Sequence, residues 1–320
     1  MALMEIRNLK KYFNVNGGQL HAVDDISVSI DRGQTLGIVG ESGCGKSTLG
    51  KVLMRLETAT EGEIIYDGTD LTKLSERQFK PYRRRIQMIF QDPFASLDQR
   101  MTVSQLIAEP IRTLTKEKDK KKIMGRAREL MDMVGLARRL ENTYPHELDG
   151  GRRQRIGIAR ALASEPELIV CDEPVSALDV SIQAQVINLL QDLQKQKNLT
   201  YIFITHDLSV VKHISDKIAV MYLGQIVETS GSKELFANTL HPYTKALFSA
   251  IPIPDIDVKR ERILLKGELS SPVNPGIGCR FAKRCLYACE ACTKAQVPLK
   301  DYGNGHKAAC CRIEGGCENV

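Results

Sequence analysis

The residues best suited to chemistry lie in a glycine-rich loop at residues 40–48, GESGCGKST. The loop matches G-x-x-x-x-G-K-[ST], follows the apolar run LGIV and precedes a helical pattern, which is the context this motif requires. Backbone N–H groups of such a loop wrap phosphates, Lys46 places a positive charge near the outer phosphates, and the Ser47 hydroxyl can ligate magnesium. The residues expected to contact nucleotide are Gly40, Ser42, Gly43, Cys44, Gly45, Lys46, Ser47 and Thr48.

An acid pair follows a second apolar run, because Asp172 and Glu173 come directly after LIVC. Beside a phosphate loop, Asp172 is expected to hold the magnesium shell and Glu173 to polarise an attacking water; the alternative is a helix cap. His206 ends a further strand-like run at residues 200–207. Ligands of α/β nucleotide folds gather at such strand ends, which favours a site role for His206 over a structural one.

Asp149 precedes a glycine pair that opens a helical pattern. Such a helix start suits anion binding, because bare N–H groups and the positive end of the helix dipole both point at the ligand. A carboxylate at this place repels a phosphate. Two interpretations are open: the charge discourages a phosphate there, or Asp149 caps the helix.

Cysteines crowd the end of the chain, where seven of the nine lie between Cys279 and Cys317. The N-terminal sequence does not resemble a secretion signal and the chain is expected to be cytosolic, so this crowding favours metal ligation over disulfides. Four thiolates make a closed zinc site and can also hold an iron–sulfur cluster, which leaves both metals open. The alternative is unligated thiols in a loop.

Alternation of short apolar runs with helical patterns predicts an α/β fold with a buried sheet. Strands are expected within residues 34–40, 167–174, 200–207 and 216–228, and an amphipathic helix at 181–197. Residues 94–139 are expected to be mostly helical. The basic run KEKDKKK at 116–122 is interpreted as a solvated turn or helix face, with a basic binding patch as the alternative. Pro and Gly punctuation from residue 240 predicts a separate appendage. We therefore expect a nucleotide-binding domain at 1–239, with a helical subdomain at about 94–165, and an extension at 240–320.

Composition and charge set broad limits on the class of protein. The chain has 320 residues, 42% hydrophobic and 26% charged, with a net charge of +6 that discriminates poorly among nucleic acid, membrane and nucleotide partners. No apolar run approaches the ~18 to 20 residues that span a bilayer, and the N-terminal MALMEIRNLKKYF does not resemble a signal peptide. The chain is expected to be cytosolic, with any membrane role depending on a partner.

Taken in order, these motifs resemble those of the ABC-transporter ATPases over nearly the whole chain. The resemblance implies a P-loop ABC ATPase with a RecA-like core, an inserted helical subdomain and a small Cys-rich C-terminal appendage, using ATP and Mg²⁺. It adds Gln91 as the Q-loop residue that touches magnesium, Leu148–Arg152 as the signature motif and Asp179 in the D-loop SALD as the residue that couples two sites. Lys46, Glu173, His206 and Gln91 are then the expected catalytic residues, with Glu173 as general base. Phe13, or Tyr12 as second choice, is expected to stack on adenine.

Two longer stretches, CDEPVSALDVSIQAQVINLLQDLQ and HPYTKALFSAIP, are similar to the di- and oligopeptide importer branch and its F-type ATPase subunit. The resemblance implies a second, different ATPase subunit, two transmembrane permease subunits at the cytoplasmic face of the membrane, and an extracellular peptide-binding protein. It implies no nucleic acid partner. Relatives in this branch also import nickel or other small solutes, which is the alternative substrate class.

The branch also implies a role for the cysteines and for Asp149. Its C-x5-C-x6-C pattern and a downstream cysteine match Cys279, Cys285, Cys292 and Cys310, implying a 4Fe-4S cluster with Zn²⁺ as the alternative. Cys289, Cys311 and Cys317 are surplus, and Cys311 could replace Cys310. In paired ATPase subunits each ATP lies between one phosphate loop and the other subunit's Leu-Ser-Gly-Gly-Gln signature. Here Asp149, Gly150, Gly151 and Arg152 depart from that signature, so we expect a heterodimer in which this signature's site turns ATP over slowly.

Two other classes compete with transport. A soluble ABC ATPase for DNA repair or translation usually carries a long coiled coil, a zinc module inside the ATPase or two fused halves, and this chain shows none of these. A nucleotide-binding regulator without hydrolysis conflicts with the intact Lys46, Asp172, Glu173 and His206. Transport is therefore the preferred interpretation.

Overall fold

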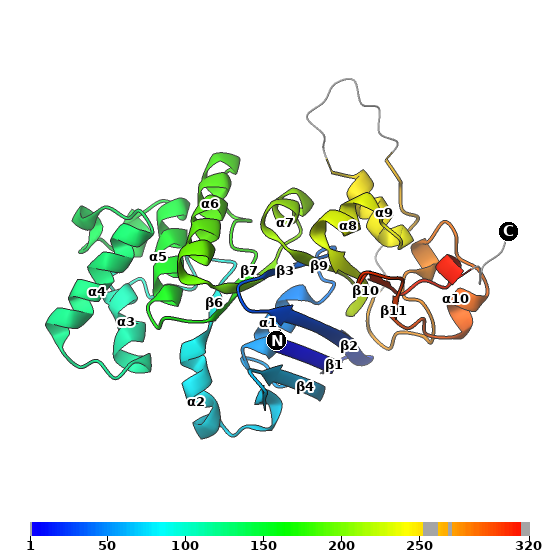
Figure 1. The fold of residues 1–320 in the computed structure, drawn as a ribbon, viewed down its shortest axis with the longest axis horizontal. Helices are drawn as coiled ribbons and strands as arrows, with labels where there is room; N and C mark the ends of the chain where they lie inside the picture. Colours follow the sequence, from blue (N-terminus) through cyan, green and yellow to red (C-terminus); the bar gives the residue numbers. More distant parts are fainter. Residues whose placement is uncertain (1, 252–261, 268–270, 315–320) are drawn as a thin grey trace. The chain divides into compact units, whose positions relative to one another are not determined.

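The structure is a computed structural model that describes residues 2–251, 262–267 and 271–314. The chain forms two compact units (Figure 1). The first is built mainly from Lys73–Ile204 together with Asp31–Thr35, and the second from Met4–Ile30, Leu36–Thr72 and the chain from Thr205 onward. Both units therefore mix segments that are distant in sequence.

The first unit has a parallel three-stranded arrangement of β6 (Ile86–Ile89), β7 (Leu168–Asp172) and β8 (Thr200–Ile204). Ile86 pairs with Leu168, and Leu168 with Thr200. Every residue of β7 and β8 is buried, and all but Asp172 and Thr200 are apolar, as is typical of parallel strands that helices cover. The strands predicted within residues 167–174 and 200–207 are confirmed.

Helices make up the rest of the first unit (Figure 1). They are α2 (Glu76–Arg85), α3 (Val103–Leu114), α4 (Lys120–Met133), α5 (Gly150–Leu162) and α6 (Val180–Lys197). Helix α3 packs against both α4 and α5, so the helical character predicted for residues 94–139 is confirmed. In α6, Val186, Leu190 and Leu193 are buried, as the 3.6-residue period predicts.

The second unit contains two sheets. The first is antiparallel, in the order β2 (Gly18–Asp31), β1 (Ala2–Val15), β4 (Glu61–Tyr66) and β5 (Thr69–Asp70). The second joins β3 (Thr35–Val39) in parallel to β9 (Lys217–Tyr222), and continues antiparallel through β10 (Gln225–Gly231) and β12 (Lys307–Ala308) to β11 (Lys300–Asp301). The apolar run predicted at 216–228 thus folds as the hairpin of β9 and β10.

Short helices complete the second unit: α1 (Lys46–Leu53), α7 (Leu208–Ile214), α8 (Ser232–Ala237), α9 (Pro242–Ser249) and α10 (Ala291–Lys294). The chain after residue 240 shares the core of this unit. Phe281 packs edge-on against Tyr222 with ring centroids 5.3 Å apart and also contacts Tyr243, while β12 pairs with β10. The change at residue 240 therefore marks a change in sequence character and not a break in the packing of the described residues.

Candidate nucleotide-binding site and cysteine cavity

The glycine-rich loop connects β3 to α1 in the second unit. Gly43 and Gly45 have φ of 79° and 105°, a region that disfavours other residues. A Cβ on Gly45 would lie 1.9 Å from the carbonyl oxygen of Ala22, and one on Gly40 would lie 2.1 Å from that of Met221. The loop is therefore shaped by close backbone approach, as a phosphate-wrapping loop requires.

Lys46 lies inside this loop and is 4% exposed. Its Nζ donates hydrogen bonds to the carbonyl oxygens of Gly40 and Glu41, at 2.8 and 3.0 Å. Ser47 and Thr48 follow in the first turn of α1, while Ser42 and Gly43 are exposed at the loop's tip. The structure thus places a cation within the loop and a hydroxyl at the helix start that follows it.

Cys44 and His206 belong to the same unit. Cys44 is 1% exposed and burial raises the pKa of its thiol, which supports the interpretation of a small packed side chain. His206 is exposed after β8, next to Thr205, whose N–H donates to the carbonyl oxygen of Ile38 on β3 at 3.2 Å. His206 therefore lies beside the strand that leads into the loop.

The acid pair lies in the first unit, at the end of β7. Asp172 is 4% exposed, and Glu173 adopts a left-handed φ of 45°, a conformation that is strained for a residue with a side chain. Gln91 donates from Nε2 to the Glu173 carboxylate at 2.7 Å. The structure thus brings the predicted Gln91 and Glu173 together, although 82 residues separate them in the chain.

Asp149 is the N-cap of α5. Its carboxylate accepts a hydrogen bond from the Arg152 N–H at 2.8 Å, and the Arg152 Nε lies 3.4 Å from its other oxygen. A Cβ on Gly151 would lie 2.7 Å from Cγ2 of Ile182, so that glycine lets α5 approach α6 closely. Asp149 therefore caps α5, with a guanidinium beside its carboxylate, and the effect of its charge on a phosphate stays a prediction.

Asp179 is a second acidic cap in the same unit. It accepts from the Ile182 N–H at 3.0 Å and the Ser181 hydroxyl at 2.8 Å at the start of α6. The hydrogen bond from Ile182, followed by that from Ser181, lowers the pKa of this carboxyl. Asp179 is accordingly held in its ionised form.

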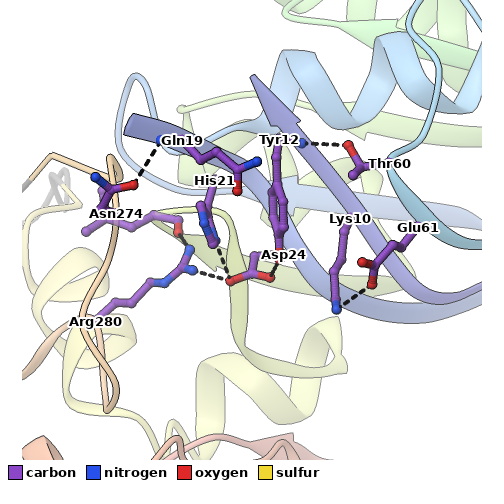
Figure 2. A network of polar contacts seen from close by, with 10 residues as sticks. Lys10, Tyr12, Gln19, His21, Asp24, Thr60, Glu61, Asn274 and Arg280 are labelled. Atoms are coloured by element: carbon purple, nitrogen blue, oxygen red, sulfur yellow. Dashed lines mark hydrogen bonds and ion pairs between the residues drawn. The ribbon is translucent and has the colours of Figure 1, made fainter. Parts of the chain in front are cut away.

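The two candidates for adenine stacking differ in their surroundings. The Tyr12 ring stacks on His21 with centroids 3.9 Å apart, and its hydroxyl donates to Asp24 (Figure 2). Phe13 is half-buried beneath the Lys11 ammonium, 4.6 Å from its ring centroid. Both rings thus have a neighbour over one face, and Phe13 stays the first choice, with Tyr12 as the second.

Five cysteines of the C-terminal segment line one cavity of about 20 Å³: Cys279, Cys285, Cys292, Cys310 and Cys311. This set contains all four ligands that the resemblance implies, together with the proposed substitute Cys311. The Sγ atoms of Cys292 and Cys311 are 3.4 Å apart. Those of Cys289, Cys292 and Cys311 all lie within 4.8 Å of one another, so the tightest triad shares only Cys292 with the implied set. We call this cavity with its five thiols the cysteine cavity; Cys317 lies outside the described residues.

Two sulfurs of the cysteine cavity have a spacing that suits metal ligation. Sulfurs bound at about 2.3 Å to a tetrahedral zinc lie about 3.8 Å from one another, close to the 3.4 Å between the Sγ atoms of Cys292 and Cys311. Cys289 is held in a disulfide, whereas the five cavity residues are thiols. Cys292 and Cys311 are therefore spaced as two ligands of one zinc ion would be, and three further thiols line the same cavity.

The arginines next to Cys279 and Cys285 in the sequence have carboxylate partners. Arg280 pairs with Asp24, and Arg284 pairs with Glu41. Burial raises the pKa of Cys279 to about 11 and also raises that of Cys285 and Cys310, while Arg312 lowers the latter two somewhat. Arg312 is the basic residue that faces the thiols.

Several residues around the loop are not apparent from the motifs. Tyr243 accepts a hydrogen bond from the Glu41 N–H, Arg284 binds the Glu41 carboxylate, and Arg280 binds Asp24. Tyr243 lies in the HPYTKAL stretch, which signals the branch without indicating a contact with the loop. Nothing in the spacing of the arginines pointed to their partners.

No helix among the described residues is long and apolar enough to cross a bilayer. Two protein families match the chain. The family "ABC transporter" matches residues 23–176, and the family "Oligopeptide/dipeptide transporter, C-terminal region" matches residues 227–292. The second match covers β10, α9 and the first part of the cysteine segment.

Curated relatives match almost end to end. A putative oligopeptide transport ATP-binding protein of Bacillus subtilis is 53% identical, over 97% of this chain and 95% of the relative. An oligopeptide transport ATP-binding protein of Escherichia coli is 49% identical, over 98% and 96%.

Solved structures of ATP-binding cassettes are also similar. A dimeric cassette bound to ADP and Pi in a post-hydrolysis state has a TM-score of 0.67 and 28% identity, covering 72% of this chain and 98% of its own. The cbiO1 protein of Clostridium perfringens, part of an ABC transporter complex, has a TM-score of 0.66 and 28% identity, covering 74% and 91%. The chain belongs to the ATPases of the ABC transporter family, in the branch of the oligopeptide and dipeptide transport ATP-binding proteins.

Proposed function

We propose that this chain hydrolyses MgATP to energise the import of di- and oligopeptides through a membrane transporter. The observation that carries the ATPase function is the phosphate loop, in which close backbone contacts and the buried Lys46 prepare an anion site. The names of the relatives support peptide as the substrate class. Peptide specificity is then supplied by other subunits of the transporter. This chain works at the cytoplasmic face of the two permease subunits.

The proposed roles follow from the residues. Lys46 and the loop N–H groups bind the phosphates, and Ser47, Gln91 and Asp172 supply oxygen ligands for Mg²⁺. Glu173 takes the proton of the attacking water, with His206 contacting the γ-phosphate. The hydrogen bond from Gln91 to Glu173 supports a link between the Q-loop and the base. Phe13 stacks on adenine, and Asp179 couples this site to that of the second ATPase subunit.

Glu173→Gln tests the catalytic assignment in the complex assembled with its permease and ATPase partners. We expect ATP turnover at this chain's site to fall by about 10² to 10⁴, the range for loss of a general base, while ATP binding is kept. Gln196→Glu, a change of matched size at an exposed position on α6, is the control and should leave turnover unchanged. Full turnover in Glu173→Gln, with the partner's site inactivated, would contradict the assignment.

We further propose an asymmetric pair of ATPase subunits. Asp149 holds a negative charge where the family signature meets the γ-phosphate bound to the opposite subunit. At about 4 Å, two unit charges at an effective dielectric near 20 interact by about 4 kcal/mol. The adjacent Arg152 offsets part of this repulsion. The site that uses this signature therefore binds ATP and turns it over slowly, and the pair works best with a partner whose signature is ordinary.

We propose that the cysteine cavity holds a metal: the resemblance implies a 4Fe-4S cluster, whereas the short distance between the Cys292 and Cys311 sulfurs supports Zn²⁺, the alternative. Cys279, Cys285 and Cys292, with Cys310 or Cys311, would be the ligands, and the metal would supply cross-links to a segment with little apolar core of its own. Iron, zinc and acid-labile sulfide are measured on the anaerobically purified chain. Iron with sulfide supports the cluster, zinc alone supports the alternative, and neither metal overturns the proposal.

A further inference from the structure

Glu41 is an unexpected residue within an anion-binding loop, because its carboxylate repels phosphate. Three contacts converge on it. Its N–H donates to the Tyr243 hydroxyl at 3.0 Å, its carbonyl accepts from the Lys46 Nζ at 3.0 Å, and its carboxylate accepts from the Arg284 Nη1 at 2.7 Å. The residue thus connects the loop lysine to two side chains of the C-terminal segment.

Both C-terminal partners are held firmly. Tyr243 is fully buried on α9, with its ring 4.6 Å from that of Tyr222. Arg284 follows Phe281, a core residue, and directly precedes Cys285 of the cysteine cavity. The Arg284 and Glu41 side chains are 11% and 26% exposed, so this ion pair is better shielded than an ordinary surface pair. Removing one partner would leave a poorly solvated charge behind.

Electrostatics agree with this geometry. Burial lowers the pKa of Arg284, but the hydrogen bond to Glu41 and the proximity of Tyr222 outweigh it, and the net shift is upward. Burial likewise raises the pKa of Tyr222, and Arg284 opposes that rise. The guanidinium is therefore charged and faces both groups.

Arg280 makes a parallel set of contacts on another side of the loop. It binds the Asp24 carboxylate and the carbonyl oxygen of Leu223 (Figure 2). The neighbouring Gly224 donates its N–H to the carbonyl oxygen of Cys44 in the loop at 2.8 Å. Two arginines, each directly beside a cysteine of the cavity, thus bind residues in or around the loop: Arg284 binds the Glu41 carboxylate, and Arg280 binds the Leu223 carbonyl oxygen.

We propose that Arg284 is a positioning residue for the phosphate loop: its ion pair neutralises Glu41 and fixes the peptide that holds Lys46, so that the loop accepts MgATP. The proposal rests on the proposed nucleotide site. It gives the C-terminal segment a role in nucleotide affinity in addition to any metal it holds. Loss of Arg284 would leave the Glu41 charge to oppose the phosphates, whereas loss of both charges would not.

The test measures the Kd of Mg²⁺ with a non-hydrolysable ATP analogue by isothermal titration on the full chain. We expect Arg284→Gln to weaken binding about tenfold, because an unpaired carboxylate then faces the phosphates. Glu41→Gln alone should bind within about twofold of wild type or tighter. The double variant, Arg284→Gln with Glu41→Gln, should recover most of the lost affinity. Lys283→Gln removes the neighbouring exposed charge and should change little.

Each outcome is decisive. An unchanged Kd in Arg284→Gln, an equal loss in Lys283→Gln, or no recovery in the double variant would overturn the proposal. Arg284→Lys keeps the charge and should stay within about threefold of wild type; a larger loss would mean that packing, not charge, is at work. If Arg284→Gln does not fold, the double variant is used instead, because it leaves neither charge of the pair behind. Its Kd for the MgATP analogue should equal that of Glu41→Gln. Wild-type chain that binds no nucleotide would contradict the proposed function and not this inference.

Discussion

At the scale of single residues, two carboxylates lie where backbone N–H groups could bind anions, and each has an arginine beside it. Glu41 lies 2.7 Å from Arg284 and is largely shielded, while Asp149 lies 3.4 Å from Arg152 and both those side chains are about half exposed. The first pair is therefore the stronger. The charge of Asp149 is compensated less well, and we therefore expect it to slow ATP turnover at the site that uses this signature.

Asp149→Ser should raise ATP turnover of the assembled complex by about tenfold. A repulsion of about 4 kcal/mol, reduced by Arg152 and by solvent, leaves roughly 1.4 kcal/mol to be relieved. Asp149→Asn is the matched control, since asparagine caps a helix as well as aspartate does and carries no charge. It should show a similar rise. Unchanged turnover in both variants would leave Asp149 as a cap only.

At the scale of elements, glycines and caps decide which helices and loops can meet. Gly151 lets α5 approach Ile182 of α6, and Asp149 and Asp179 cap these two helices. His241 caps α9 with Nδ1, which accepts from the Tyr243 N–H at 3.1 Å. The Tyr243 side chain that reaches Glu41 is thus set by a capped helix start.

Gly151→Ala should destabilise the first unit by about 1 to 3 kcal/mol, because the added methyl group overlaps Ile182. Gly157→Ala in the same helix is the control: its Cβ meets nothing within 4 Å, and alanine favours helix, so stability should rise by about 0.5 to 1 kcal/mol. Urea unfolding of both variants measures the difference. Equal stability would mean that α5 and α6 do not pack as described.

His241 should make the second unit sensitive to acid. Burial lowers its pKa from 6.5 to about 3 in the folded chain, so the unfolded chain binds the proton first as pH falls. Its contribution to stability is complete above about pH 6.5 and is lost progressively toward pH 3, about 2 kcal/mol of it by pH 5. His241→Asn, which keeps a cap, should lose less stability between pH 7 and 5. An identical loss would contradict burial of a neutral imidazole.

At the scale of the whole chain, the C-terminal segment is part of the unit that carries the phosphate loop. Phe281, Tyr243 and Phe248 share a core with residues of β9 and β10. The buried Glu228 of β10 accepts from the His241 N–H and contacts the His306 ring at 2.8 Å, which connects α9 and the end of the segment to the sheet. Folding of this segment and shape of the loop should therefore depend on each other.

Phe281→Ala should destabilise the second unit by about 3 to 5 kcal/mol and lower nucleotide affinity in the same variant. Thermal unfolding followed by circular dichroism and by a bound fluorescent nucleotide gives the two readouts. Leu286→Ala, at a neighbour whose side chain is 44% exposed, is the control and should stay within about 0.5 kcal/mol of wild type. Unchanged nucleotide binding with a separate early transition would mean that the segment unfolds on its own.

Local patterns predicted much of this architecture. The apolar runs ending at Val39 and Asp172 are buried strands, and the periodicity after Asp179 is a helix, because burial imposes these periods directly. The contacts of Arg284 with Glu41 and of Arg280 with Asp24 could not be predicted, since they join residues 243 and 256 positions apart and only the folded chain brings them together. That Asp149 caps α5 was one of two open interpretations; the hydrogen bond that it accepts from the Arg152 N–H shows the cap, while the effect of its charge on a phosphate stays a prediction.

The central claim is that this chain is an ATPase subunit built to pair with a different one, and light scattering tests it most directly. Glu173→Gln traps bound ATP, and the full chain carrying it is examined with MgATP, with and without the additional Asp149→Ser change. We predict that the single variant stays monomeric and the double variant dimerises, because Asp149 opposes the γ-phosphate of a second copy. Dimerisation of the single variant to the same extent would contradict the claim.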